Sequence, residues 1–235
     1  MKKIILISFC MGYCISMLSQ TFGGTDQTII PIYNNLSNIE GNKKYTQDFY
    51  KDVEGNPYIF KNFVLSEIVG IKTKMMLRYN AYDDVIEVQK APNEIYTISK
   101  DPLYNTFLMN NNQFKLRLVN LENNSSEPSY LYLFELLNKN NLSLLRRDKI
   151  DFIEGRIPRT SFELGNKPKF TSVKYSYYLE TKDKKIVAFP ESKAKLLLMY
   201  PQQESEITKF IKANSISLSR EKDLITLTNF LSTIQ

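Results

Sequence analysis

The stretch Arg78–Gln89, RYNAYDDVIEVQ, decides the fold, because it places an acidic dipeptide between two runs of alternating apolar and polar residues. Alternation with a period of two is typical of β-strands, and aspartate is common in the turns that join them. The stretch therefore predicts an antiparallel hairpin with Asp83 and Asp84 in its turn. The same alternation places Glu87 on the solvent-facing side of the returning strand.

Similar alternating segments, rich in aromatic and β-branched residues, continue across residues 58–190. They predict strands at residues 75–80, 85–89, 94–99, 114–119, 130–137, 142–146, 171–180 and 184–189. Short connections rich in turn residues separate most of them, so consecutive strands are expected to pair as a meander. Residues 153–169 hold two glycines and two prolines without a steady apolar period. They predict a long loop, which either covers an open sheet edge or acts as a functional lid.

The apolar period lengthens after residue 190. Apolar residues three and four apart predict helices at 191–199, 205–213 and 220–233, with Ser219 as the N-cap of the last one. Their apolar stripes need a surface to pack on, and the sheet is the available one. The sequence therefore predicts an α+β fold in which an antiparallel, twisted β-meander sheet, open or barrel-like, is followed by two or three C-terminal helices.

The chain divides into four regions on this basis. Residues 1–20 are a predicted signal peptide, 21–57 an N-terminal extended segment, 58–190 the sheet region and 191–235 a helical region packed on the sheet.

The first twenty residues have the pattern of a secretory signal peptide. Lys2 and Lys3 precede the uncharged apolar stretch Ile4–Leu18, which is too short for a lasting transmembrane span. Cleavage is expected near Ser19 or Gln20, and the alternative is a single N-terminal membrane anchor. The sequence therefore predicts an exported protein of the periplasm or cell envelope, with no transmembrane segment in the mature chain.

Composition excludes several kinds of catalysis. Both cysteines, Cys10 and Cys14, lie in the predicted signal peptide, and the chain has no histidine. A mature chain would then lack disulfides, thiolate or histidine metal ligands, and serine–histidine catalysis. Without Lys2 and Lys3, 29 of the 31 basic residues remain against 25 acidic ones, and the charges are interspersed. We expect no nucleic-acid partner, no metal and no cofactor.

Three stretches carry a resemblance to known sequences. They are RYNAYDDVIEV at 78–88, SYLYLFELLNKNNLSLLRRDK at 129–149 and FIKANSISLSREKDLITLTNFL at 210–231. Together they resemble an uncharacterised family of exported bacterial proteins of unknown function. The resemblance implies export and a terminal pair of helices joined by a short extended link, and it implies no activity.

Five residues are the candidate site residues. Asp83, Asp84 and Glu87 are close in sequence, but they supply too few oxygens for a calcium loop, and catalysis by paired carboxylates would need a shared cleft. The alternative is that they are ordinary hairpin residues. Tyr175 and Tyr177 fall on one face of a strand, where they either fill the core or line an apolar pocket.

One further motif, near the C-terminus, has the spacing of a catalytic site. Ser219 and Lys222 have the serine-x-x-lysine spacing of penicillin-recognising enzymes, but the other motifs of those enzymes are missing. The sequence favours a non-enzymatic binding or structural accessory protein of the envelope, whose partner is an envelope protein or an apolar ligand. Two alternatives stay open: a carrier that holds an acyl chain or other apolar ligand between sheet and helices, and a carboxylate-based hydrolase.

Overall fold

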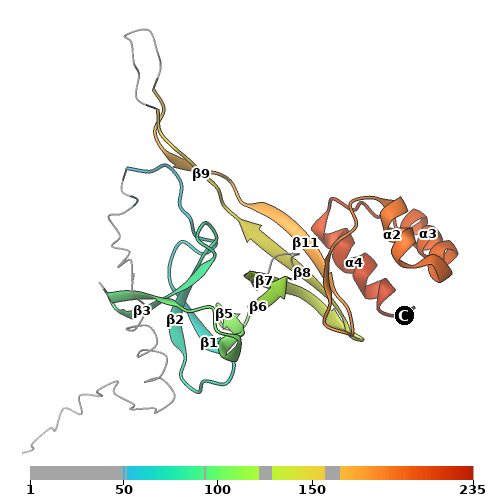
Figure 1. The fold of residues 1–235 in the computed structure, drawn as a ribbon, viewed down its shortest axis with the longest axis horizontal. Coiled ribbons are helices and arrows are strands. Elements are labelled where there is room, and N and C mark those ends of the chain that lie inside the picture. Colours follow the sequence, from blue (N-terminus) through green and yellow to red (C-terminus); the bar gives the residue numbers. More distant parts are fainter. Residues whose placement is uncertain (1–49, 51, 93, 122–128, 157–164, 235) are drawn as a thin grey trace, which may run out of the picture.

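The computed structural model describes residues 50, 52–92, 94–121, 129–156 and 165–234. The predicted signal peptide and most of the predicted N-terminal extended segment lie outside these residues. The described chain forms a ten-stranded antiparallel sheet, a separate two-stranded ladder and a C-terminal group of helices, arranged as in Figure 1. This is the predicted α+β fold, and the sheet stays open, with β4 and β12 at its two edges.

The predicted strands appear in the predicted order, and further short strands are present beside them. They are β1 (Val64–Ile68), β2 (Met75–Asn80), β3 (Val85–Ala91), β4 (Glu94–Ile98), β5 (Thr106–Met109), β6 (Phe114–Leu121), β7 (Ser129–Lys139), β8 (Leu142–Lys149), β9 (Phe152–Ile153), β10 (Lys169–Phe170), β11 (Lys174–Glu180) and β12 (Ile186–Ala188). The helices are η2 (Pro102–Tyr104), α2 (Lys193–Met199), η3 (Pro201–Gln203), α3 (Glu204–Ala213) and α4 (Glu221–Leu231).

The sheet is not one continuous meander. Its order is β12-β11-β8-β7-β6-β5-β1-β2-β3-β4, so β5 pairs with β1 and not with β4, which precedes it in the chain. Pairing of Ile68 with Phe107 joins the two meanders, and both side chains are buried. The predicted pairing of all consecutive strands is therefore wrong at this step, because apolar burial at β1 outweighs the short local connection.

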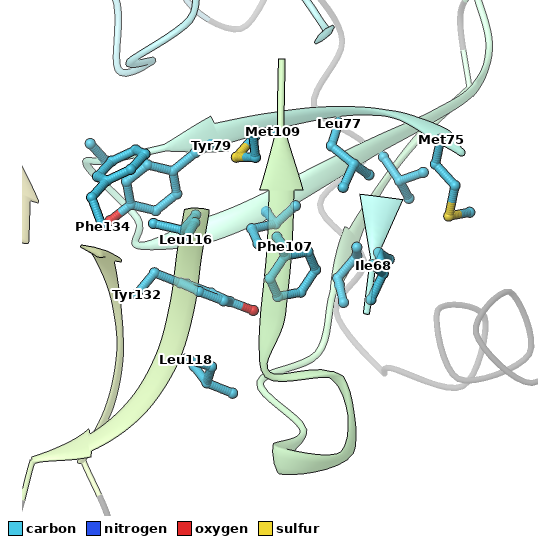
Figure 2. Close-up of a cluster of buried hydrophobic side chains, with 14 of the residues drawn as sticks. Ile68, Met75, Leu77, Tyr79, Phe107, Met109, Leu116, Leu118, Tyr132 and Phe134 are labelled. Carbon is cyan, nitrogen blue, oxygen red and sulfur yellow. The ribbon is translucent and has the colours of Figure 1, made fainter. Parts of the chain in front are cut away.

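The first core forms because the sheet curls strongly. Tyr79 on β2 lies 6.0 Å from Tyr132 and 5.9 Å from Phe134 on β7, measured between ring centroids, although three strands separate β2 from β7 in the sheet. Figure 2 shows these rings beside Phe107 and Leu116. Alternate residues of β1 to β7 thus point into one interior, where their aromatic and aliphatic side chains fill the core.

A second core lies between the helices and the far end of the long strands. Leu142 and Leu144 of β8 and Leu179 of β11 are fully buried there against Leu196, Ile207, Leu224, Leu227 and Leu231 of the helices. In Figure 1 the helices cover one face of this end of the sheet. A third, smaller group, Val119, Leu133 and Leu145, is buried on the opposite face.

One helix-end prediction is wrong. The N-cap of α4 is Arg220 and not Ser219, and no side chain caps it. The Asp223 carboxylate instead accepts a hydrogen bond from the Ser217 backbone N–H at 2.8 Å, so the acid in the first turn holds the link before α4. Ser219 is exposed and its hydroxyl lies 2.9 Å from that of Ser217, so it is not activated by Lys222 in any described contact.

The predicted long loop at 153–169 has paired ends. Strands β9 and β10 form a ladder, and the backbone groups of Arg156 and Asn166 exchange hydrogen bonds of 2.9 and 3.1 Å beyond it. Residues 157–164 lie outside the described residues. A β-carbon at Gly155 would lie 2.7 Å from the Pro168 side chain, so glycine permits this close approach. The described part of the loop pairs with itself and with Glu54, and neither edge of the large sheet is among its partners.

Candidate functional site

The two adjacent aspartates of the hairpin turn have different environments. The turn between β2 and β3 is where the sequence predicts it, and Asp83 is exposed in it. Asp84 adopts a left-handed backbone, with φ of 54°, and its side chain is largely buried. Its carboxylate accepts hydrogen bonds from the Tyr79 hydroxyl at 2.8 Å and the Tyr132 backbone N–H at 3.3 Å, and it pairs with Lys100. Asp84 therefore fixes the hairpin tip to β7.

Glu87 is buried, and its predicted position on a solvent-facing side is wrong. It pairs across the hairpin with Arg78, whose Nε and Nη2 donate to Glu87 Oε2 at 3.0 and 2.6 Å. The guanidinium lies 3.5 Å from the ring centroid of Tyr58 and 4.2 Å from that of Phe63. These two rings come from the chain before β1 and cover this face of the hairpin, so they shield Glu87 from solvent.

Burial controls the ionisation of this group. Desolvation raises the pKa of Glu87 above its usual value, although the Arg78 charge acts in the opposite direction. Glu87 Oε1 is buried and accepts no hydrogen bond from the described residues. Burial, with smaller contributions from the negative charges of Asp83 and Glu87, raises the pKa of Tyr50 to about 12. The three carboxylates predicted as candidates are thus a turn residue, a structural anchor and one half of a buried ion pair.

The two candidate tyrosines lie in a different cluster, on the face of β8 and β11 that meets α4. Arg146 on β8 donates from Nε and Nη2 to Asp148 at 2.6 and 2.8 Å, and from Nη1 to Glu221 of α4 at 2.7 Å. The Tyr177 hydroxyl donates to the same Glu221 at 3.2 Å. The Arg146 guanidinium lies 4.6 Å from the ring centroid of Tyr175. We call these five residues the Arg146 cluster.

The charges of the Arg146 cluster hold it in one arrangement. Burial raises the pKa of Asp148, and its hydrogen bonds to Arg146 act in the opposite direction. Burial, followed by the negative charge of Glu221, raises the pKa of Tyr177 to about 12, so this hydroxyl stays a donor at neutral pH. Bidentate pairing of an arginine with a carboxylate fixes geometry as well as charge. The arginine under Tyr175 is therefore rigidly placed.

Tyr175 is the part of the cluster that faces solvent. It is 53% exposed, whereas Asp148 beside it is 2% exposed. One face of its ring rests on a fixed cation, and such contacts are worth about 0.5–1 kcal/mol at exposed sites. The arrangement presents a large aromatic side chain in a fixed orientation, which is suited to contact with another molecule.

Sequence reasoning identified the tyrosines and missed the other three members. Arg146 and Asp148 stand two apart on one strand, and this spacing predicts that they share a face. Glu221 is 75 residues from Arg146, and no local signal connects them.

Among the residues that the structure describes, no group of three or more acidic, cysteine or histidine side chains is placed to hold a metal ion. No described helix is long and apolar enough to cross a membrane.

The fold and this cluster define the class of the protein: an α+β protein whose open antiparallel sheet is joined to C-terminal helices through a partly buried arginine and two carboxylates. No family model, curated protein or solved structure matches the chain. The resemblance to exported bacterial proteins therefore stays a prediction.

Proposed function

We propose that the chain is an exported, non-enzymatic accessory protein of the periplasm or cell envelope, which binds a protein partner through the surface around Tyr175. The apolar N-terminal stretch behind two lysines supports export. The observation that carries the binding role is the exposure of Tyr175 on a rigid arginine.

The chemistry of the cluster fits a contact with another protein. Tyrosine and arginine are among the residue types enriched at the energetic centre of protein interfaces, and tyrosine buries a large area at little cost in conformational entropy. The fixed Arg146 removes part of that cost before a partner arrives, since the ring above it is already oriented. Asp148 and Glu221 carry two negative charges against the single positive charge of Arg146. The cluster therefore has one excess negative charge, which favours a partner that presents a lysine or arginine.

The two alternatives have less support. A carrier needs an apolar cavity between sheet and helices, but the leucines of β8, β11 and α4 that face this space are fully buried against one another. A hydrolase needs two carboxylates that converge on a cleft, and Asp84 and Glu87 each already pair with a lysine or arginine.

Native mass spectrometry of the protein purified from its own envelope tests the proposal. We expect a complex with a second polypeptide in the unaltered protein and its loss in the Tyr175→Ala variant. The matched control is Leu103→Ala, because Leu103 is 72% exposed on η2, far from the cluster in the sequence, and this variant should retain the complex. Thermal unfolding of both variants should stay within a few degrees of the unaltered protein, since exposed side chains contribute little to stability.

Three results would refute this function. A monomer with a bound acyl chain would favour the carrier, and a complex that survives Tyr175→Ala would place the interface elsewhere. Retention of the protein in the cytoplasm after expression in its own host would refute export.

A further inference from the structure

A cavity of about 310 Å³ lies on the sheet face opposite the helices, away from the Arg146 cluster. Residues of β6, of β11, of the turn before β12 and of β12 itself line it, among them Arg117, Val119, Glu180, Lys184, Lys185 and Ile186. Its volume is near the lower limit of about 300 Å³ for small-molecule sites. The size is therefore suited to a small ligand.

Arg117 and Glu180 form one wall of the cavity and neutralise each other. Arg117 Nη1 and Nη2 donate to the two Glu180 oxygens at 2.6 and 2.9 Å, and Nη1 also donates to Glu135 at 3.0 Å. Burial opposes the charge of Glu180, but Arg117 outweighs it and lowers the pKa of this carboxyl. Glu180 is therefore ionised at neutral pH, and its charge is already compensated.

Two lysines give the cavity its free charge. Three cationic side chains and one carboxylate line it, an excess of two positive charges. Lys184 Nζ lies 3.8 Å from the buried Glu180 while the Lys184 side chain is itself 78% exposed, and Lys185 has no ion-pair partner among the described residues. Loose surface pairs of this kind contribute little, about 0–1 kcal/mol. Both ammonium groups are thus available to an anion.

Apart from Asn120, the remaining lining is apolar. Val119 belongs to the small core on this face, and Ile186 packs against that core while staying partly exposed. A ligand with a charged head alone would leave the exposed part of Ile186 in water, and burying this surface favours a ligand that also carries a short apolar group.

We propose that this cavity binds a small amphiphile with one anionic head group, a carboxylate or a phosphate, which Lys184 and Lys185 hold while its apolar part covers Ile186 beside the small core. This site is independent of the Tyr175 surface. It differs from the carrier alternative, because the ligand lies on the face opposite the helices.

Methyl NMR of the purified protein, titrated separately with octanoate, octyl phosphate, octylamine and inorganic phosphate, tests the proposal. We expect saturable shifts of the Ile186 δ1 methyl signal with octanoate, octyl phosphate or both, and none with octylamine. Binding of only one anion would identify the head group. Inorganic phosphate should bind at least tenfold more weakly than octyl phosphate, because it leaves the apolar surface uncovered.

The variant that removes the free charge is Lys184→Asn with Lys185→Gln. Asparagine is chosen because Lys184 has φ of 62°, a left-handed conformation that asparagine tolerates. We expect about tenfold weaker binding of the anionic amphiphile, since two charge contacts are lost. The control is Lys193→Asn with Lys222→Gln, which removes the same charge from the helices and should leave binding unchanged.

Three outcomes would overturn the proposal. They are an equal Ile186 shift with octylamine, unchanged affinity in the Lys184 and Lys185 variant, and equal loss of affinity in the helix control. The last outcome would show that net charge, and not this cavity, governs binding. Unchanged methyl signals from the rest of the protein verify that each variant is folded.

Discussion

Replacing Arg78 by methionine should expose how much the buried ion pair under Tyr58 and Phe63 matters to stability. Methionine keeps apolar volume between the two rings but removes both donors to Glu87 Oε2. Glu87 is fully buried, so the variant would remove both guanidinium donors and leave the charged carboxylate with only the uncharged Tyr58 and Asn80 side chains as partners. Loss of one partner of such a pair costs about 3–5 kcal/mol at neutral pH.

The loss of stability caused by Arg78→Met should be smaller at low pH than at neutral pH. Burial already raises the pKa of Glu87, and removing the Arg78 charge raises it further. A carboxyl with a higher pKa in the folded than in the unfolded state binds more protons when folded, so its protonation stabilises the fold at low pH. This stability is lost as the pH rises above the unfolded-state pKa toward the folded-state pKa. The destabilisation should therefore shrink on acidification, by up to about 1.4 kcal/mol per pH unit.

Urea unfolding followed by circular dichroism, at pH 5 and pH 8, measures both effects. The double variant Arg78→Met with Glu87→Leu is the control, because replacing both charges by apolar groups is often neutral or stabilising. We expect the double variant to recover most of the lost free energy of unfolding. A cost for Arg78→Met alone that is below about 1 kcal/mol, or equal at the two pH values, would refute the burial of Glu87 as its cause.

Two further predictions concern the hairpin turn and the β9–β10 ladder. Asp84→Ala should cost about 3 kcal/mol in urea unfolding, because Tyr79, Lys100 and the Tyr132 N–H lose an acceptor, whereas Asp83→Ala should cost less than about 1 kcal/mol. Similar costs at the two positions would contradict the different roles of these aspartates. Gly155→Ala should speed hydrogen exchange at the Arg156 and Asn166 amides, because the new Cβ would contact Pro168 at 2.7 Å. Unchanged exchange there would show that the ladder adjusts without loss.

Local patterns predicted most of the fold. The alternation around Asp83 and Asp84 gave the β2–β3 hairpin, and the helical spacing gave α2, α3 and α4 within a few residues. Strands β1 and β5 were missed, because VLSEI does not alternate between apolar and polar residues and TFLM has only four residues. Their pairing crosses the chain from one meander to the other, and the sequence holds no local signal for that step.

The site residues show where sequence reasoning ends. A turn between Asn80 and Val85 places Arg78 opposite Glu87, so this pair could have been predicted from the hairpin register alone. The burial of Glu87 could not, because its cover comes from Tyr58 and Phe63, at least twenty residues earlier. Alternation shows that a strand has two different faces, but it does not show which of them another part of the chain will cover.

The two proposed binding surfaces follow from one property of β11. Tyr175, Tyr177 and Leu179 point to the face that meets the helices, whereas Tyr178 and Glu180 point to the face that bears the cavity. Because the strand itself separates them, a partner at Tyr175 and an anionic amphiphile at Lys184 and Lys185 would not compete for space. Effects of variants on the two faces should then add, as expected for sites without shared contacts. If the amphiphile instead weakened partner binding, the coupling would have to pass through β11, and the two surfaces would form one regulated site.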